Sequence, residues 1–328
     1  GYRNENFKPW TLPDGTTVLM GGGFEYSIGD DGHYYAYPQG DRSAKPSVRM
    51  SSSGLYFDCI VRQEDLDEKN TWDAREDYKD QYKVYSDETL RDIENQANDL
   101  YYNTNYAIIG NFGGMALGDA MHIPGPALKN PKGIRDLTDF FAAMLIRPEY
   151  IKELFQMQTE IALINLKNCY QAVGEKINVI VLSTTDFGTQ NGLLISPDTF
   201  RELFKPFYTK VNNWIHEHTG WKIYTHTCGA VSELIPDLID SGFDVLNPVQ
   251  VSAAGMDPAS LKKQYGDKLV FMGGACDPQG ILVNGTPEEV YEEAKKNAYI
   301  FSENGGYIGA NVHNLQYNVP VENFLAEI

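Results

Sequence analysis

The residues best suited to chemistry lie in the run Thr225-His226-Thr227-Cys228-Gly229, where an imidazole and a thiol are two positions apart. Residues 222–225 predict a strand, so both side chains leave the end of that strand and can turn toward one point. Zinc takes sulfur and nitrogen ligands in tetrahedral geometry, and catalytic zinc sites keep one position open. Two alternatives stay open, a core histidine beside a small buried cysteine and a Cys–His nucleophile pair. The spacing makes His226 and Cys228 candidate metal ligands.

Two further metal-capable residues, Cys276 and His313, each follow a later predicted strand. If both joined His226 and Cys228 on one ion, the site would be closed and structural. An open catalytic site needs three protein ligands, or one ligand that can leave. The residue types leave open which of the two completes the site.

Polar side chains follow the other predicted strands. Asp186 is the candidate for proton transfer or for orienting a substrate, with a loop or helix-cap carboxylate as the alternative. Neutral amides at these positions suit a polar, uncharged part of a substrate, although each can equally satisfy backbone groups of its own loop. The candidate substrate-binding residues are Asn111, Gln190, Asn247, Gln250, Asn314 and Gln316.

The elements that position these residues begin at Ser86, after which strand-like and helix-like apolar patterns alternate. Ser86 and the capping box that begins at Thr286 predict helix starts, and Ser196-Pro197 predicts one helix that continues through Trp214. The expected strands are 106–109, 179–182, 222–225, 244–246, 269–272 and 307–310.

This alternation predicts an α/β fold with a parallel sheet, either a TIM-type (β/α)8 barrel or a doubly wound open sheet. The absence of a Gly-rich phosphate fingerprint after any strand favours the barrel, whose active sites lie at the carboxyl ends of the strands. Six strands are two fewer than a barrel requires, so we expect that the first strands are lacking in this chain.

Residues 1–85 are rich in Gly and Tyr and show no helical period before Ser86. Short β-like runs at 17–20, 34–37 and 55–61 are separated by turn signals. We therefore expect a β-hairpin-rich segment, residues 1–85, packed on a barrel domain, residues 86–328. The many aromatic rings of this segment either line an apolar pocket or pack a hairpin onto the barrel.

The composition excludes several classes of protein. The net charge is −18 and no cluster of Lys and Arg is visible, which argues against a nucleic-acid partner. No apolar run approaches the length of a membrane span and no signal pattern opens the chain, so we expect a cytoplasmic protein without a membrane partner. The four cysteines show no paired spacing, and reduced thiols are expected.

Several short runs carry a family resemblance. They are Asp186-Phe187-Gly188-Thr189-Gln190-Asn191-Gly192, Ile195-Ser196-Pro197, His226-Thr227-Cys228-Gly229, Asp244-Val245-Leu246-Asn247-Pro248-Val249-Gln250, Gly273-Gly274-Ala275-Cys276-Asp277-Pro278-Gln279, His313-Asn314-Leu315-Gln316 and Pro320-Val321-Glu322-Asn323. Together they resemble the uroporphyrinogen decarboxylase superfamily, especially its corrinoid-dependent methyltransferase-like branch. The resemblance is good from about residue 100 to residue 328 and looser before it.

The resemblance implies a zinc-dependent methyltransferase. It would move a methyl group between a small methylated substrate (methoxylated aromatic, methylamine or methylthiol type) and a corrinoid (cobalamin) carried by a partner protein, as in O-demethylation and one-carbon metabolism. His226 and Cys228 match the zinc-binding H-x-C pair of that branch. The late ligand, usually Cys, falls on His313 here.

Two alternatives remain. One is a metal-free decarboxylase like uroporphyrinogen decarboxylase, although true decarboxylases of the family lack the H-x-C pair at this strand. The other is a non-catalytic barrel that binds a ligand or acts as a scaffold for a corrinoid protein. Family members also carry two N-terminal barrel strands that we do not find in this sequence.

Overall fold

The computed structural model describes residues 7–61, 72–112 and 117–328, which fall into two compact units. The first unit contains Gly1–Tyr82 and Ala120–Leu154, and the second contains Lys83–Asp119 and Phe155–Ile328. The division falls within the long helix α4 (Pro148–Val173). The boundary at residue 85 that the sequence suggests stays a prediction.

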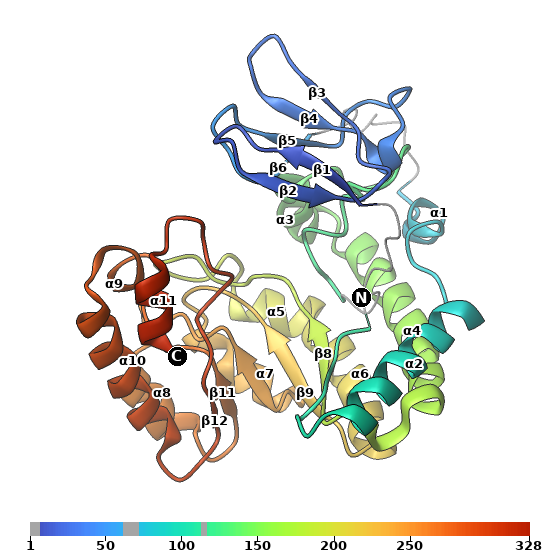
Figure 1. Ribbon diagram of the computed structural model, residues 1–328. Helices are drawn as coiled ribbons and strands as arrows, with labels where there is room; N and C mark the ends of the chain where they lie inside the picture. The colour runs from blue at the N-terminus through green and yellow to red at the C-terminus, as the bar shows by residue number, and fades with distance from the viewer. Residues whose placement is uncertain (1–6, 62–71, 113–116) are drawn as a thin grey trace. The chain divides into compact units, whose positions relative to one another are not determined.

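The first unit carries two small antiparallel sheets (Figure 1). Their strands are β1 (Lys8–Thr11) with β2 (Thr17–Met20), and β3 (Tyr26–Ile28), β4 (Tyr34–Ala36), β5 (Val48–Met50) and β6 (Cys59–Ile60) in that order. Aromatic rings pack around Trp10, with the centroid of Phe24 at 5.1 Å and that of Phe57 at 6.0 Å. The ring-rich hairpins therefore bury an aromatic core of their own.

The helices of the first unit are short. They are η1 (Pro38–Gly40), α1 (Ala74–Tyr78) and α3 (Leu137–Ile146), followed by the beginning of α4. The sequence shows no helical period before Ser86, but α1 forms there. Asp73 caps α1 by accepting the N–H of Glu76 at 3.0 Å. Five residues are too few to show a helical period, so the cap is the main local signal.

The second unit contains a six-stranded parallel sheet within the described part of the chain. The strand order is β12-β11-β10-β9-β8-β7. The bounds are β7 (Ile109–Gly110), β8 (Val179–Ser183), β9 (Lys222–His226), β10 (Val245–Asn247), β11 (Val270–Met272) and β12 (Tyr307–Ile308). All six expected strands form, with shifted ends. The α/β class and the partial TIM-type barrel with a preceding β-rich segment are confirmed.

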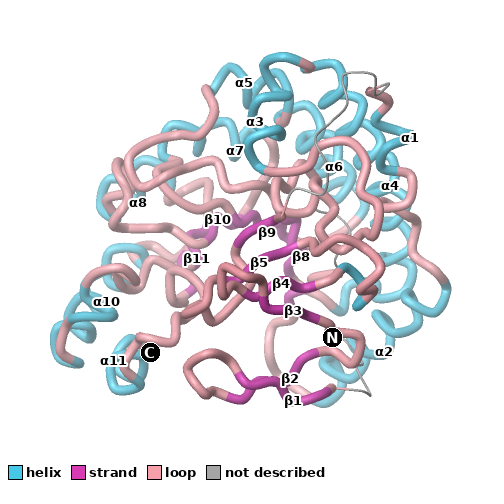
Figure 2. Tube along the Cα trace, turned by 90° about the horizontal axis from the view of Figure 1, so that it is seen from above, coloured by secondary structure: helices cyan, strands magenta, loops and turns pink. Residues whose placement is uncertain are grey.

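Helices lie outside the arc that β8 to β11 make (Figure 2). The helices of the second unit alternate with its strands, beginning with one helix before β7. They are α2 (Asp87–Asn103), α4, η2 (Gly174–Lys176), α5 (Pro197–Leu203), α6 (Lys205–His218), η3 (Ser232–Leu234), α7 (Ile235–Asp240), α8 (Pro258–Tyr265), α9 (Ile281–Asn284), α10 (Pro287–Ser302) and α11 (Val321–Glu327). The predicted caps Ser86 and Ser196 and the capping box at Thr286 are confirmed.

The single helix expected to run from Pro197 through Trp214 is wrong, since the chain forms α5 and α6 there. The break lies at Phe204, whose φ of −110° departs from helical values. Pro206 follows directly, and a proline ring has no N–H to donate and clashes with the preceding turn. Apolar periodicity continues across such a break and so conceals it.

Burial alternates along the central strands, and this alternation decides which side chains can reach the site. In β9, Ile223 and Thr225 are buried whereas Tyr224 and His226 are partly exposed. Successive side chains of a strand point to opposite faces, so Tyr224 and His226 share the face away from the buried one. In the loop after β8, the buried Phe187 packs on Phe200 with ring centroids 5.1 Å apart.

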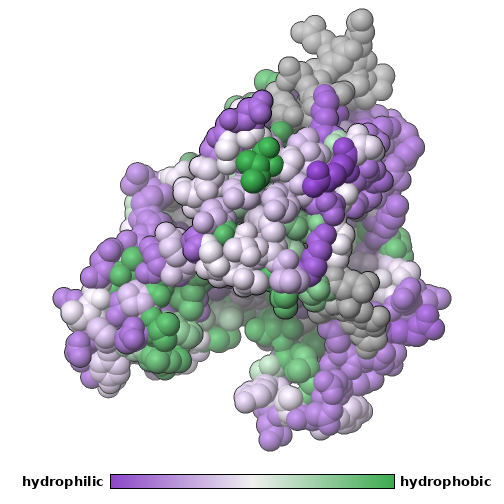
Figure 3. Space-filling view, turned by 45° about the horizontal axis from the view of Figure 1, so that its top comes forward, coloured by the Kyte–Doolittle hydropathy of each residue, from purple (hydrophilic) through white to green (hydrophobic). Residues whose placement is uncertain are grey.

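The face shown in Figure 3 is largely hydrophilic, with some hydrophobic patches. Helix α11 exposes Val321 and Leu325, at 66% and 60%, and buries the polar residues Asn323 and Glu327. Asn323 donates from Nδ2 to the carbonyl oxygens of Leu282 and Gly285, at 3.0 and 2.9 Å. Hydrogen bonds of this buried amide thus help to hold the helix that ends the loop carrying His313.

In the described ranges, every helix is too short or too polar to span a bilayer.

Candidate metal centre

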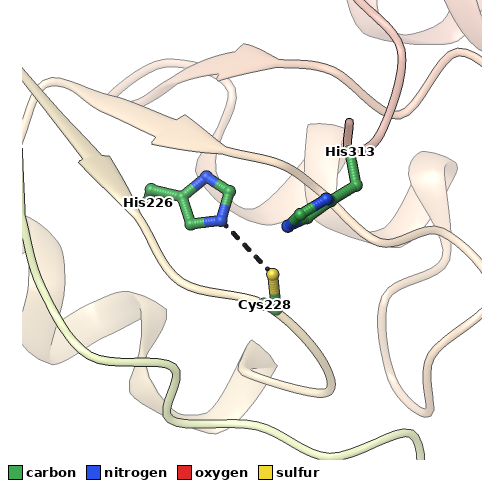
Figure 4. Close-up of side chains that lie close together, drawn as sticks. All are labelled: His226, Cys228 and His313. Atoms are coloured by element: carbon green, nitrogen blue, oxygen red, sulfur yellow. Dashed lines mark hydrogen bonds between the residues drawn. The ribbon is translucent and has the colours of Figure 1, made fainter. Parts of the chain in front are cut away.

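Three side chains from the carboxyl ends of β9 and β12 converge in the second unit (Figure 4). One ligand atom from each of His226, Cys228 and His313 lies within 4.8 Å of the others. Sγ of Cys228 is 3.3 Å from Nε2 of His226, and the two imidazole centroids are 5.4 Å apart with planes inclined by 70°. Among the described residues, this is the only group of at least three His, Cys, Asp or Glu side chains close enough together to share a metal ion.

His226 is placed by its strand. It is the last residue of β9, aligned with Ser183 of β8 on one side and Asn247 of β10 on the other. The buried Thr184 donates from Oγ1 to the carbonyl oxygen of His226 at 2.8 Å, which satisfies the backbone where the sheet ends. The imidazole ring of His226 therefore extends from a backbone that the neighbouring strands hold on both sides.

Cys228 is placed by a turn pinned to the loop after β8. Its N–H donates to Oδ1 of Asp186 at 2.8 Å, and its carbonyl oxygen accepts the N–H of Gly188 at 3.1 Å. Next along the chain, the N–H of Ala230 donates to the carbonyl oxygen of Thr189 at 2.8 Å. Hydrogen bonds to the loop after β8 therefore fix the backbone from which the thiol of Cys228 extends.

The electrostatics of Cys228 favour the neutral thiol. Burial raises the pKa of Cys228, and the neighbouring carboxylate of Asp186 raises it further by its charge and by a hydrogen bond. A bound cation acts in the opposite direction, because it stabilises the thiolate. A cation bound at the cluster would therefore offset the negative charge of Asp186 beside Cys228.

His313 reaches the cluster from the exposed loop between β12 and α11. Burial, followed by the charge of His226, lowers the pKa of His313, and Asp186 raises it by a smaller amount. A neutral imidazole has a free nitrogen lone pair for a metal. Nδ2 of Asn311 donates to the carbonyl oxygen of His313 and helps to shape the loop.

Cys276 does not join the cluster. It is fully buried and packs in an apolar group with Leu282 and Val290. Burial, and then the charge of Glu293, raise the pKa of the Cys276 thiol to about 12. The residue follows β11 as expected, but its side chain enters the core between that strand and the helices. Between the two residues that the sequence left open, the structure brings His313 to the cluster.

The amides of Gln190 and Gln250, expected to bind substrate, are engaged with the protein. Oε1 of Gln250 accepts the N–H of Gly229 at 3.1 Å, and its Nε2 donates to Oε1 of Gln190 at 2.9 Å. Gln190 in turn donates from Nε2 to the carbonyl oxygen of Ser252 at 2.7 Å. The two side chains form a relay that supports the turn carrying Cys228.

Asn247 is likewise hydrogen-bonded within the site, to His226 at 2.6 Å. Asn314 and Gln316 are exposed on the loop of His313, and Nε2 of Gln316 donates to the carbonyl oxygen of Asn314 at 3.4 Å. Asn111 follows β7, which β8 separates from β9.

Sequence reasoning missed Tyr224, whose hydroxyl donates to Oδ1 of Asn247 at 2.5 Å. Burial raises the pKa of Tyr224 to about 12, so the group stays a neutral donor. The signal was present in the sequence, because Tyr224 and His226 are two positions apart on one strand and side chains of a strand repeat with period two.

A parallel partial barrel that gathers one thiol and two imidazoles at the carboxyl ends of its strands defines a class of barrel proteins with a metal-capable centre. The family model described as uroporphyrinogen decarboxylase (URO-D) matches residues 129–327, more than half of the chain. The chain belongs to the uroporphyrinogen decarboxylase family, and the resemblance drawn from its motifs is confirmed.

The chain is also similar to two known methyltransferases. The chain is 31% identical over 102 residues to the methylcobamide:CoM methyltransferase MtaA of Methanosarcina barkeri, which is 31% of this chain and 28% of that protein. The match therefore spans less than a third of that relative. A solved structure of a methyltransferase from Methanosarcina mazei aligns with a TM-score of 0.50 and 18% identity, covering 73% of this chain and 61% of that chain. This structural likeness supports the fold alone.

Proposed function

We propose that this protein is a zinc-dependent methyltransferase, which moves a methyl group between a small methylated substrate and a corrinoid carried by a partner protein. The observation that carries the proposal is the convergence of His226, Cys228 and His313 at the carboxyl end of the sheet. The similarity to a methyltransferase that acts with a methylcobamide supports the choice of reaction and of partner. The substrate would be of the methoxylated aromatic, methylamine or methylthiol type.

The three side chains fit zinc. One sulfur and two nitrogen donors are a set that zinc accepts, and three protein ligands leave a fourth position open, as in catalytic sites. Two ligand atoms about 2.0–2.3 Å from one tetrahedral ion lie roughly 3.5 Å apart. Sγ of Cys228 and Nε2 of His226, at 3.3 Å, are already close to that spacing. When bound, zinc would act as a Lewis acid on a heteroatom of the substrate.

Asp186 is the group we assign to proton transfer. Its Oδ1 accepts the N–H of Cys228, which keeps the carboxylate beside the cluster, and its side chain is exposed at the carboxyl end of β8. A heteroatom that gains or loses a methyl group changes its basicity and needs a proton donor or acceptor within hydrogen-bond reach. Asn314 and Gln316, exposed beside His313, are the amides left to bind the rest of the substrate.

The first experiment measures metal content and methyl transfer in the same preparations. Purified protein is analysed for zinc, and a panel of methylated substrates is tested for methyl transfer to reduced cobalamin by the change in corrinoid absorbance. We expect about one zinc per chain and transfer that His226→Ala abolishes together with the zinc. His218→Ala is the matched control, because this histidine stacks on Trp214 outside the cluster, with ring centroids 4.7 Å apart.

Each outcome that contradicts the proposal would indicate a different function for this protein. A metal-free wild type that decarboxylates an acidic substrate would identify a decarboxylase and contradict the proposal. Bound zinc without transfer from any class of substrate would identify a ligand-binding or scaffolding barrel. Equal transfer rates in wild type and His226→Ala would remove the metal from the mechanism.

A further inference from the structure

The side chain of Asn247 is hydrogen-bonded at both ends of its amide. It is the last residue of β10 and its side chain is almost completely buried. Nδ2 donates to the carbonyl oxygen of Met272, on the neighbouring strand β11, at 3.0 Å. Oδ1 accepts the hydroxyl of Tyr224 at 2.5 Å and lies 2.6 Å from Nδ1 of His226. Three hydrogen bonds therefore lock one amide between three strands.

The carbonyl of Met272 decides how this amide is oriented. A backbone carbonyl oxygen can only accept a hydrogen bond, so the amide nitrogen of Asn247 must face it. Oδ1 consequently faces Tyr224 and His226. An amide oxygen cannot donate, so Nδ1 of His226 must carry the hydrogen that joins the two groups.

A neutral imidazole carries one hydrogen, and the second nitrogen then has a free lone pair. In His226 this nitrogen is Nε2, which lies 3.3 Å from Sγ of Cys228. The orientation of one buried amide thus determines which nitrogen of His226 faces the cluster. We propose that Asn247, supported by Tyr224, is a positioning residue that holds His226 as the Nδ1-protonated tautomer, so that Nε2 is the metal-binding atom.

This inference rests on the proposed function for the identity of the ion, and it changes the role expected for Asn247. Its amide oxygen has no lone pair left for a substrate, because both have partners among the described residues, and its nitrogen already donates one hydrogen to the carbonyl oxygen of Met272. A neutral acceptor beside Nδ1 of His226 also affects the imidazole differently from a carboxylate at the same position. A carboxylate would make the imidazole a more basic ligand, and an amide preserves more of the Lewis acidity of a bound cation.

The direct test is made on metal-free wild type with 15N-labelled histidine, and a variant is needed only to assign the signal of His226. Long-range 1H–15N correlation spectra at pH 8 report which nitrogen of each ring carries hydrogen. We expect His226 to be protonated on Nδ1, assigned through its loss in His226→Ala. A His226 signal from the Nε2-protonated tautomer would overturn the inference, whatever the metal content of the protein.

The second test measures zinc affinity against a competing chelator. Removal of groups that orient a metal ligand typically weakens metal binding about 10–100-fold, and we expect a loss in that range for Asn247→Leu and a smaller one for Tyr224→Phe. Asn247→Asp should keep the tautomer and bind zinc more tightly. Asn297→Leu is the matched control, because Nδ2 of the buried Asn297 makes the same kind of bond to the carbonyl oxygen of Ala275, at 3.1 Å.

The two proposals fail in different ways. Wild type that binds no zinc contradicts the proposed function, while the tautomer of His226 is still read from the spectra. Tight zinc binding that Asn247→Leu leaves unchanged, or that Asn297→Leu weakens equally, overturns the positioning role. If Asn247→Leu does not fold, Tyr224→Phe and the spectra of the wild type decide the question.

Discussion

The backbones of Gly188 and Gly229 pass in direct contact, so that a β-carbon added to Gly229 would lie 2.4 Å from the carbonyl carbon of Gly188. Gly229 also has a φ of +88°, in the left-handed region that side chains disfavour. The turn that carries Cys228 depends on this close approach, because the hydrogen bonds between the two loops form across it. Glycine at 229 is therefore a requirement of the site geometry.

Gly229→Ala should displace this turn. We expect a loss of about 2 kcal/mol in the free energy of unfolding and a loss of bound zinc, since both the contact and the backbone angle oppose a β-carbon. Urea unfolding and metal analysis measure the two effects. The control is Gly192→Ala, where a β-carbon has open space and no positive φ is required. Equal behaviour of the two variants would contradict the structural role of the contact.

Alanine at the two candidate cysteines should separate ligand from core residue. Cys228→Ala is expected to lose zinc with little change in the stability of the metal-free protein. Cys276→Ala is expected to keep zinc and to lose about 1–2 kcal/mol, because it leaves a small cavity in a packed apolar cluster. Zinc lost from Cys276→Ala but retained by Cys228→Ala would reverse the assignment.

Asp186→Asn tests proton transfer apart from metal binding. The amide oxygen of asparagine can still accept the N–H of Cys228, so we expect zinc to be retained. Methyl transfer should fall by about 10²–10⁴-fold if the carboxylate moves a proton in the rate-limiting step. The measurement is the transfer rate per bound zinc across pH. A rate equal to that of wild type would leave Asp186 with a structural role only.

Stability should depend on pH through Glu327. Burial, and then the charge of Glu293, raise the pKa of the Glu327 carboxyl from 4.5 to about 7. Both oxygens are buried without a hydrogen-bond partner among the described residues. A carboxyl whose pKa is raised by folding is harmless while it is protonated in both states, and it destabilises the folded state increasingly as the pH rises from 4.5 to about 7.

Glu327→Gln removes the charge that causes this loss. Compared with wild type, the variant should be more stable by about 2 kcal/mol at pH 8, a value reduced for partial solvent screening, and nearly equal at pH 4. Urea unfolding at the two pH values gives the comparison. A difference that is the same at both pH values, or larger at pH 4, would show that the carboxyl is not buried as described.

Local signals in the sequence were sufficient for much of the fold. Ser86, Ser196 and Thr286 each begin a helix because their side chains bond to backbone groups three residues ahead, a contact that needs no tertiary structure. The alternation of strands and helices likewise predicted six parallel strands. The proximity of His226 and Cys228 could also be predicted from the sequence, because both lie at the end of one strand and no contact with a distant element is needed to bring them together.

Only the tertiary structure decided which side chains from distant strands point toward the site and which point into the core. Cys276 and His313 both follow strands, yet only the packing of β11 against its helices directs Cys276 into the core and leaves His313 at the cluster. The sequence predicted that Asn247 binds substrate, whereas in the structure its amide donates to the carbonyl oxygen of Met272. Sequence spacing places a residue on an element, but contacts between elements far apart in the chain determine what its side chain touches.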